Sequence, residues 1–416
     1  MKVFKFGGGV LKDAEAVRQM TDIVRTEKDL ICVVSAFSKM TNAFEKIVGK
    51  GYGAAESEIR EVEVFHYAMA KELFEDTVPT WEQNILPIFK ELKVKIEENH
   101  NLQYDQSYDQ IVCYGEILSS AIISCYWSEI GLVHETWDAS KVIITDSSYR
   151  SGRVNWELCE EKTQLKLSEG QSSGLGIVLT QGFIGGTIDG YTTTLGREGS
   201  DYTAAVLGNL YGAEEVVVWK DVPGIMTADP AEFENTSKMD EISYLEAVEL
   251  SYFGAKVIHP NTIRPLQNKG IPLVVKSLYS PDDDGTQIIS KAKSAPAHPI
   301  FIKKENQVLV SIQARDFSFI IEDALARIFN TLAKHGIRIN LMQHGAVSIS
   351  LVFDWDRDRL DGILGELLPE FKILYNQDLE LWTIRQYTKA AIDSIVGNKR
   401  IYVQQKSRKT ARFVLG

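Results

Sequence analysis

The segment Thr192–Pro230 constrains the fold more than any other part of the chain. It starts as a polar loop bracketed by Gly196 and Gly199, continues as an apolar helical stretch, and reaches a β-rich run at Val216–Trp219 before a Pro-Gly turn. A loop, a helix and a strand in this order predict one unit of a layered α/β fold. Backbone N–H groups at the start of such a helix favour an anion. Arg197 adds a planar guanidinium that suits a carboxylate or a phosphate.

The remainder of the first 290 residues alternates strand and helix patterns. Leu30–Ala36 is a continuous apolar run, which is typical of a parallel strand buried on both faces. Asp13 is a suitable N-cap for a helix with an apolar face. Other strands are expected at Val3–Phe6, Val142–Thr145, Gly176–Leu179 and Ile271–Lys276, and other helices within 57–99 and at Gly115–Ile130. This alternation predicts an α/β fold with a mainly parallel sheet over residues 1–290.

A segment rich in Pro, Asp and Ser between Pro281 and Pro299 predicts a domain boundary. Beyond it, residues 300–376 show a strand–helix–strand–strand–helix–strand pattern, which is the ferredoxin-like order. Residues 377–416 repeat the start of this pattern but lack its final helix and strand. The expected elements are Gln307–Ile312, Glu322–His335 with Gly336 as its C-cap, Ile337–Met342, Val347–Phe353, Arg357–Leu368, Phe371–Tyr375, Leu379–Arg385, Ala390–Val396, Arg400–Gln405 and Ala411–Leu415.

Composition narrows the possible partners and the compartment. The chain has 416 residues, enough for two or three domains, and a formal net charge of −12. This charge argues against non-specific binding to nucleic acid or to an anionic membrane. We see no run of about 18 apolar residues, so no membrane span is expected. The four cysteines form no C-x-x-C pair, which fits a reduced compartment with the cytoplasm as the default.

Short motifs in a fixed order resemble those of aspartate kinases. The match covers roughly residues 1–290 and, more weakly, the tail, and several ordered motifs are a more specific signal than one Gly-rich loop. The matching segments are Lys5–Gly8, Val33–Ala36 with Thr41-Asn42, Tyr114–Glu116, Ser151–Arg153, Leu195–Asp201, Asp221–Ile225, Thr227–Pro230 and Tyr252–Pro260.

The resemblance implies an amino-acid-kinase-type α/β/α sandwich over 1–290, followed by two ferredoxin-like ACT regulatory modules at 300–376 and 377–416, the second of them shortened. It implies transfer of a phosphoryl group from ATP, with Mg²⁺, to the side-chain carboxylate of L-aspartate, giving 4-phospho-L-aspartate. This is the first step towards lysine, threonine and methionine. It also implies lysine or threonine as an effector at the ACT modules and a homodimer or larger homo-oligomer.

The resemblance also implies a set of site residues. A lysine at a strand end that faces a glycine turn can meet a transferring phosphoryl group, while the loop N–H groups meet its oxygens. The catalytic residues would be Lys5, Asp201 and Lys256; the substrate would meet Ser35, Thr41, Glu116, Arg197 and Ser200; ATP would meet Lys5, Gly7, Gly8, Gly9, Lys220, Asp221, Met226 and Lys256. We expect Asp201 to accept hydrogen bonds from the active lysines. We expect Glu116 to pair with the α-ammonium of the amino acid, and beside that cation it could stay ionised.

Each of these residues also has a purely structural interpretation. Lys5 could be a solvated lysine beside an ordinary turn, Asp201 a helix N-cap, and Glu116 a carboxylate at a helix start. Lys256 could satisfy carbonyls at a helix end. The sequence alone leaves these alternatives open.

The implied reaction needs no general base. A side-chain carboxylate with a pKa near 3.9 is already ionised at pH 7, so the obstacle is its repulsion from the phosphate oxygens. Catalysis then consists of positioning and charge neutralisation, which lysines, loop amides and Mg²⁺ can supply. Zinc-type ligand spacing is not found. We therefore expect His259 to have a structural role at a helix end.

Four positions depart from the family pattern. Val10 follows Gly9 where hydroxyl residues are usual, Glu198 replaces a glycine, Lys220 replaces a threonine or serine, and Ala231 replaces an arginine. Two alternatives to an active aspartate kinase therefore remain: a non-catalytic amino-acid sensor, and a kinase for another acid such as glutamate. In the tail, Asn340, Gly345 and Ala346 lie where lysine-sensitive relatives tend to have acidic or hydroxyl groups, so sensitivity to lysine is left open.

Overall fold

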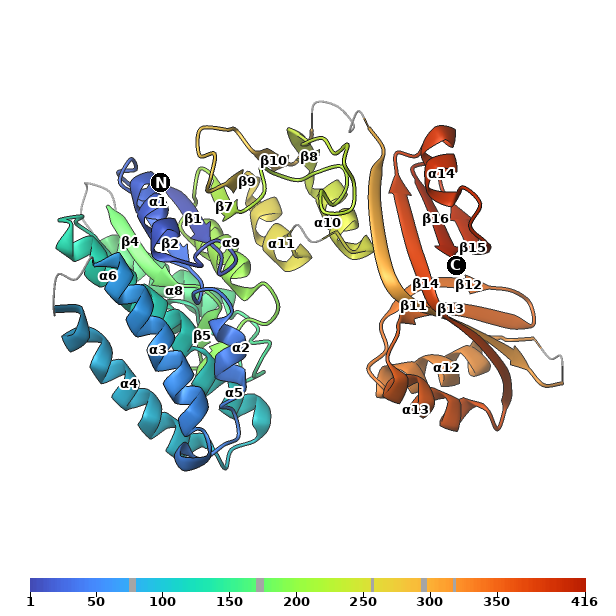
Figure 1. The fold of residues 1–416 in the computed structure, drawn as a ribbon, viewed down its shortest axis with the longest axis horizontal. Helices are drawn as coiled ribbons and strands as arrows, with labels where there is room; N and C mark the ends of the chain where they lie inside the picture. Colours follow the sequence, from blue (N-terminus) through green and yellow to red (C-terminus); the bar gives the residue numbers. More distant parts are fainter. Residues whose placement is uncertain (75–79, 170–175, 256–257, 293–297, 317–318) are drawn as a thin grey trace. The chain divides into compact units, whose positions relative to one another are not determined.

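A computed structural model describes residues 1–74, 80–169, 176–255, 258–292, 298–316 and 319–416 (Figure 1). The chain divides into two compact units. The first unit comprises Met1–Ile225, Lys238–Ser251 and Val257–Ala295, and the second unit comprises Met226–Ser237, Tyr252–Lys256 and Pro296–Gly416. The second unit thus contains two short segments that precede residue 290 in the sequence.

The first unit is built on an eight-stranded sheet. Neighbouring strands from β3 to β9 are parallel, whereas β10 runs antiparallel to β9 and parallel to β8. The order across the sheet is β3 (Glu135–Trp137), β4 (Ile177–Gln181), β2 (Leu30–Val34), β1 (Lys2–Phe6), β7 (Val216–Lys220), β9 (Leu273–Ser277), β10 (Thr286–Ile289) and β8 (Glu241–Ser243). The prediction of a mainly parallel α/β sheet is confirmed.

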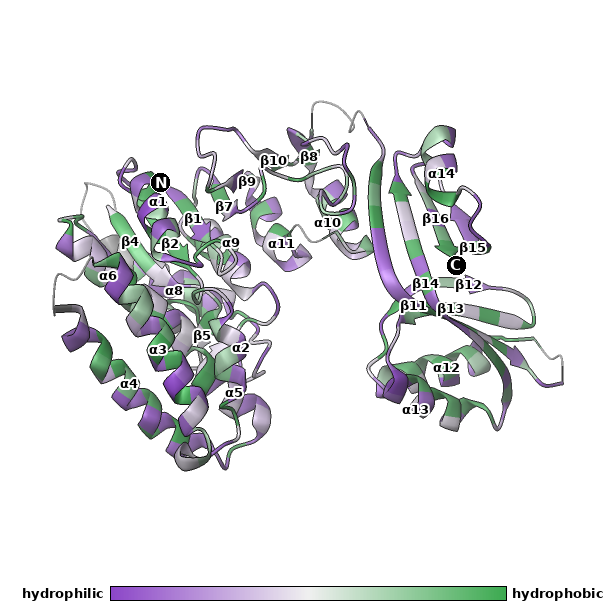
Figure 2. Ribbon diagram, viewed as in Figure 1, coloured by the Kyte–Doolittle hydropathy of each residue, from purple (hydrophilic) through white to green (hydrophobic). Residues whose placement is uncertain are grey.

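Helices cover both faces of this sheet. β2 consists of five apolar residues that are all buried, as expected for a strand between two helical layers. On one face, α6 packs against β2 and β4, and the amphipathic helices α3 and α4, which show hydrophobic and hydrophilic stretches side by side in Figure 2, pack against α6. On the other face, α9 packs against β1, β2 and β7. The helices are α1 (Ala14–Val24), α2 (Met40–Glu45), α3 (Glu56–Leu73), α4 (Thr80–Asn99), α5 (Tyr104–Val112), α6 (Tyr114–Glu129), α7 (Ala139–Val142), α8 (Trp156–Glu169), α9 (Gly199–Leu210), α10 (Tyr244–Phe253) and α11 (Pro260–Lys269).

The expectations for helix ends and short strands had different outcomes. The carboxylate of Asp13 accepts a hydrogen bond from the Ala16 N–H at 2.8 Å and caps α1, as predicted. The strand predicted at Val142–Thr145 is wrong, because α7 ends at Val142 and the residues after it make only isolated bridges. Asp138 starts this helix by accepting from the Ser140 N–H, and a four-residue apolar run cannot reveal such a cap.

The second unit contains one six-stranded sheet, in which each described pairing is antiparallel. Its order is β12 (Ile339–His344), β13 (Ser348–Asp354), β11 (Ile300–Ala314), β14 (Phe371–Arg385), β16 (Thr410–Leu415) and β15 (Ile401–Lys406), with helices α12 (Glu322–Lys334), α13 (Arg357–Leu367) and α14 (Lys389–Val396). All the elements expected beyond residue 300 form, and Gly336 adopts φ +63° after α12. β14 passes without interruption through residues 376 and 377, so the two ferredoxin-like halves share long strands rather than a linker.

The two short segments of the second unit are fastened to this sheet by aromatic side chains. The Phe233 ring stacks on Phe301 with centroids 5.5 Å apart and meets the edge of Trp382 at 5.9 Å. The guanidinium of Arg412 lies 4.9 Å from the centroid of the Phe253 ring. These contacts explain why the segments group with the tail rather than with their sequence neighbours.

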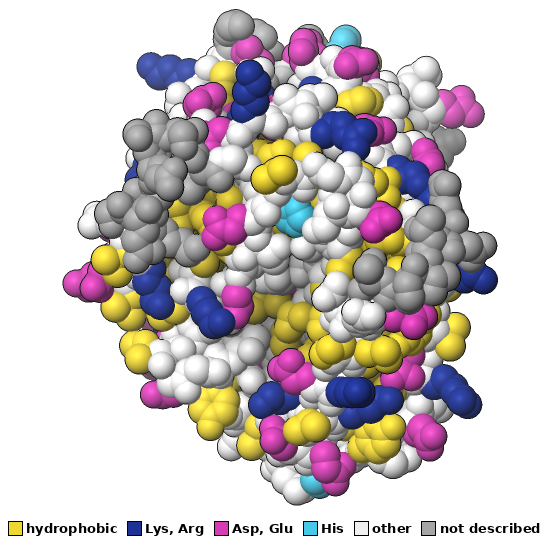
Figure 3. Space-filling view, turned by 90° about the vertical axis from the view of Figure 1, so that its left-hand side faces the viewer, with side chains coloured by type: hydrophobic (Ala, Val, Ile, Leu, Met, Phe, Trp, Pro, Cys, Tyr) yellow, Lys and Arg dark blue, Asp and Glu magenta, His cyan; other side chains and the backbone are white. Residues whose placement is uncertain are grey.

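One helical stretch, Tyr104–Glu129, is long and apolar enough to cross a membrane by length and composition alone. However, 67% of its most apolar window is buried inside the fold, as in the core helix of a globular protein. On the face shown in Figure 3, basic and acidic side chains are interspersed.

Candidate functional site

The turn after β1 brings the backbone close to Lys5, whose residue surface is only 8% exposed. A Cβ atom on Gly7 would lie 3.0 Å from the Lys5 Nζ atom, and one on Gly8 would lie 2.6 Å from the Ala36 carbonyl oxygen. The position of Gly8 therefore requires glycine, because a Cβ there would clash with backbone, whereas a Cβ on Gly7 would meet only the end of the Lys5 side chain. Gly9 faces open space. The Lys5 ammonium therefore lies against the Gly7–Gly9 turn, whose backbone N–H groups are suited to bind phosphate oxygens.

Asp201 gathers two lysines in the first turn of α9. Its Oδ1 lies 2.5 Å from the Lys5 Nζ, and its Oδ2 lies 3.7 Å from the Nζ of Lys220, at the end of β7. Burial would raise the pKa of Asp201, but the two ammonium groups outweigh burial and hold this pKa below its ordinary value. Asp201 is therefore ionised, and two cations converge on one carboxylate.

Glu116 lies beside the same turn, in the first turn of α6. It is 2% exposed; its Oε1 accepts a hydrogen bond from the Ala36 N–H at 3.2 Å, and its Oε2 has no partner. Burial raises the pKa of Glu116 to about 8, and the attraction of Lys5 offsets only part of this effect. Lys5 is committed to Asp201, so burial favours the protonated form of Glu116; that Glu116 stays ionised beside the α-ammonium of an amino acid remains a prediction.

This buried carboxyl predicts a pH effect on stability. Between about pH 4.5 and 8, folded Glu116 keeps a proton that the unfolded chain has lost, so the free energy of unfolding falls as pH rises. Glu116→Gln cannot titrate, and we expect its melting temperature to gain on that of the wild type as pH rises from about 5 to 8. Thermal melts without substrates measure this difference, and a constant difference over that range would contradict the assignment.

The loop before α9 contains a strained residue. Glu198 adopts φ +54° and ψ +31°, the left-handed region, at the position where the family pattern has glycine. Its Oε2 is buried without a hydrogen-bond partner. Neighbouring Arg197 is exposed, and within the described part of the chain its guanidinium makes no ion pair. This left-handed conformation costs roughly 1–2 kcal/mol in a residue other than glycine. Glu198 is the N-cap of α9, so Arg197 directly precedes the start of that helix.

The other expected site residues differ in burial and in the unit to which they belong. Ser35 is 8% exposed, and its carbonyl accepts from the Ser119 hydroxyl at 2.9 Å, close to the Ala36–Glu116 contact; Ser200 is also 8% exposed. Thr41 is partly exposed on α2 and Asp221 is exposed after β7. Met226 belongs to the second unit, and Lys256 lies outside the described residues.

His259 has the structural role expected of it. It is the N-cap of α11, and its Nδ1 accepts a hydrogen bond from the Asn261 N–H at 3.2 Å. This contact uses the lone pair that a general base would need.

Asp109, on α5, was missed by the sequence interpretation. Its carboxylate accepts from the backbone N–H groups of Arg150 and Thr194, both at 2.9 Å, and from the Thr194 hydroxyl at 2.6 Å. Burial raises the pKa of Asp109 to about 6, although these hydrogen bonds oppose the rise. Asp109 ties β6 (Thr192–Thr194), which leads to Arg197, to the loop at Arg150. Nothing in its helical pattern distinguishes it from a surface carboxylate.

Within the described ranges, no group of three or more His, Cys, Asp or Glu side chains could hold a metal ion. Lys5 and Lys220 instead supply positive charge, and the glycine turn supplies close backbone, which suits the anionic phosphates of a nucleotide.

Comparisons with known proteins agree with this geometry. Residues 1–277 match the model of the amino acid kinase family. Lysine-sensitive aspartokinase 3 of Escherichia coli is 31% identical over 383 residues, covering 91% of this chain and 84% of that protein. Escherichia coli aspartokinase III in complex with lysine and aspartate (T-state) is 27% identical, covers 100% of this chain and 95% of that chain, and superimposes with a TM-score of 0.84. The same enzyme with aspartate and ADP (R-state) gives a TM-score of 0.82 at 27% identity, with coverage of 100% and 96%.

Proposed function

This chain belongs to the amino acid kinase family and, within it, to the aspartokinases, and we propose that the site around Lys5 and Asp201 carries out its reaction. The reaction is the ATP-dependent phosphorylation of the L-aspartate side-chain carboxylate. The convergence of Lys5 and Lys220 on the buried carboxylate of Asp201 is the observation that supports this assignment. A solvated surface lysine would not be 8% exposed against a glycine turn.

The proposed chemistry follows from these charges. Asp201 fixes the Lys5 ammonium beside the Gly7–Gly9 turn, where it can neutralise the oxygens of the transferring phosphoryl group. Lys220 brings a second ammonium to the same carboxylate. The aspartate carboxylate attacks phosphorus as ADP leaves, and no proton has to be removed. Mg²⁺, bound mainly by the ATP phosphates, would add charge neutralisation at those oxygens. Lys256 and Met226 are proposed on resemblance alone.

The amino-acid end of the site is proposed from Arg197 and Glu116, with Ser35, Thr41 and Ser200 nearby in the family pattern. Arg197 has a free guanidinium for a carboxylate, and Glu116 has a free oxygen for the ammonium. Binding of that ammonium would favour ionised Glu116, so substrate binding should release a proton.

We expect Arg197→Ala to raise KM for L-aspartate by roughly 10- to 150-fold, equivalent to about 1.5–3 kcal/mol for a hydrogen bond to a charged group. Its kcat should change much less, because Arg197 contacts a group that does not react. Steady-state kinetics at saturating ATP measure both values. Arg60→Ala, which removes an exposed arginine from α3, is the matched control. An unchanged KM would remove Arg197 from the substrate site.

A hydroxamate assay tests the proposed function directly. Purified protein with ATP and Mg²⁺ is supplied with L-aspartate, L-glutamate or N-acetyl-L-glutamate, and the acyl phosphate is trapped with hydroxylamine. We expect product with L-aspartate. Product with another acid alone would favour the glutamate-type alternative, and no product with any acid would favour the amino-acid sensor.

Regulation and assembly are proposed from the relatives. Lysine or threonine is the proposed effector at the second unit, with a homodimer or larger homo-oligomer and a cytoplasmic location. The Asn340 amide is already occupied: its Oδ1 accepts from Lys304 at 2.8 Å, and its Nδ2 donates to Gln307 at 2.8 Å and to Asp354 at 2.9 Å. Melting-temperature shifts with each amino acid would show which one binds.

A further inference from the structure

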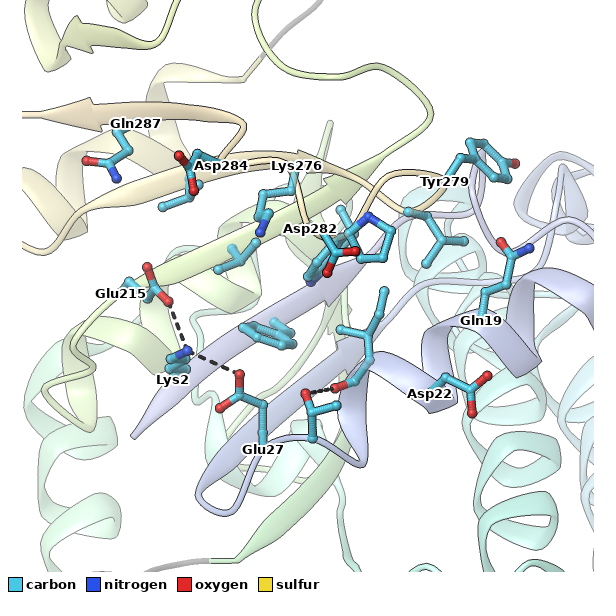
Figure 4. Close-up of a pocket in the computed structure, with 18 residues that line it drawn as sticks. Lys2, Gln19, Asp22, Glu27, Glu215, Lys276, Tyr279, Asp282, Asp284 and Gln287 are labelled. Carbon is cyan, nitrogen blue, oxygen red and sulfur yellow. Dashed lines mark hydrogen bonds and ion pairs between the residues drawn. The ribbon is translucent and has the colours of Figure 1, made fainter.

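A pocket of about 710 Å³ lies on the sheet of the first unit, away from the candidate site (Figure 4). Its floor includes Phe4 of β1 and Trp219 of β7, whereas Lys5 and Lys220 are their sequence neighbours. Successive side chains of a strand point to opposite faces of a sheet. The pocket and the candidate site therefore occupy opposite faces of the same strands.

Strand register explains why the pocket floor is apolar with one exception. Phe4, Val217 and Val274 are aligned across β1, β7 and β9. In the next row on the same face, Trp219 is aligned with Lys276. A lysine thus takes a place in a surface that is otherwise aromatic and aliphatic. Its Nζ lies 5.5 Å from the centroid of the Trp219 ring.

One cation at this wall has no carboxylate partner among the described residues. Within the described residues, Lys276 makes no ion pair, and its ammonium contacts the indole ring of Trp219. Trp219 is 3% exposed, and its Nε1 atom is buried with no hydrogen-bond partner in the described part of the chain, so the N–H is not accessible to a ligand in this conformation. Lys2, at another part of the rim, is by contrast neutralised by Glu27 at 3.1 Å and Glu215 at 3.4 Å, as the dashed lines in Figure 4 show. The Lys276 ammonium is partly exposed and not neutralised by a described carboxylate, so it is suited to an incoming anion.

The surrounding charges select the class of acceptor. Asp282 and Asp284 line the pocket beside Lys276, and Glu27 and Glu215 line it near Lys2. These carboxylates, together with Asp22, would repel a dianion such as a phosphate monoester about twice as strongly as a monoanion. A single carboxylate needs only one cation, and an apolar body attached to it would cover the Phe4–Val217–Val274 row. The volume lies within the range of small-molecule sites, about 300–1,000 Å³.

We propose that this pocket binds a small monocarboxylate with an aromatic or branched apolar body. Lys276 holds the carboxylate, and the apolar body lies on the floor. Such a ligand is chemically distinct from both substrates, and its site does not depend on the phosphoryl-transfer assignment.

Calorimetric titration of the full chain with 3-phenylpropionate tests the proposal, with 2-phenylethylamine and phenyl phosphate as the cationic and dianionic counterparts. We expect saturable binding of 3-phenylpropionate, and binding at least about tenfold weaker in Lys276→Met. Lys276→Arg keeps the charge and should retain affinity. The matched control, Lys28→Met, removes an exposed lysine that does not line the pocket and should bind like the wild type.

Three results would overturn the proposal: no saturable binding at millimolar concentrations, equal affinity in folded Lys276→Met, or equally tight binding of 2-phenylethylamine or phenyl phosphate. The comparison of the three ligands on the wild-type chain decides the question even if Lys276→Met does not fold. Because the readout is heat of binding, an enzyme inactive towards aspartate would leave the test intact.

Discussion

Replacing Lys5 by methionine should lower kcat by roughly 10²- to 10³-fold, the usual effect of removing one preorganised charge from a transition state. The Lys5 ammonium lies against Gly7 and 2.5 Å from the Asp201 carboxylate, whereas the Lys220 ammonium lies 3.7 Å from the other carboxylate oxygen, so we expect Lys220 to compensate only in part. KM for L-aspartate should change little, because Lys5 faces the phosphoryl group. Steady-state kinetics with the hydroxamate readout measure both values.

Lys28→Met is the matched control for this variant, since it removes an exposed lysine from the same unit. Melting temperatures of both variants separate loss of chemistry from loss of fold. A variant that keeps near-normal kcat would show that Lys5 is only a structural partner of Asp201. A loss of activity that simply follows loss of folded protein would lead to the same conclusion.

Asp201→Asn should be the most damaging substitution to both stability and rate. Removing the carboxylate leaves Lys5, whose side chain is 10% exposed, without its partner, and breaking a buried pair in this way costs about 3–5 kcal/mol. We expect kcat to fall by at least about 10²-fold, because the ammonium groups lose their anchor.

The stability loss in Asp201→Asn should depend on pH. Because the folded-state pKa of Asp201 is below its ordinary value, the carboxylate stabilises the wild type above about pH 4, and this contribution disappears as pH falls through the folded-state pKa. The difference in melting temperature between wild type and variant should therefore be large at pH 7 and shrink in acid. Asp189→Asn, at an exposed position, is the control. A difference that is small at pH 7 would contradict the buried ion-pair assignment.

Sequence reasoning recovered the elements with strong periodicity and clear caps, such as α1 with Asp13 and the strands and helices beyond residue 300. It failed at Val142–Thr145, where a short apolar run fits a helix end as well as a strand. It placed Lys5 and Asp201 together through family resemblance, but ionisation of Glu116 depends on burial and on competition for Lys5. Those quantities exist only in three dimensions.

The pocket on the opposite face was also beyond sequence reasoning. Lys276 follows four apolar residues at a strand end and could equally have been a solvated lysine. Its position beside Trp219 comes from the register of β7 and β9, which joins residues far apart in the chain. The same holds for Phe233, whose partner Phe301 is a long way along the sequence.

The contact between Phe233 and Phe301 affects how the chain can be truncated. A fragment that stops near residue 290 would keep Phe233 and Phe253 but lose Trp382 and Arg412. The rings of Phe233, in the loop after β7, and of Phe253, at the end of α10, would then be uncovered. Such a truncated enzyme should be prone to aggregation rather than merely deregulated. Removing residues 296–416 without exposing these rings would also require substitutions at Phe233 and Phe253.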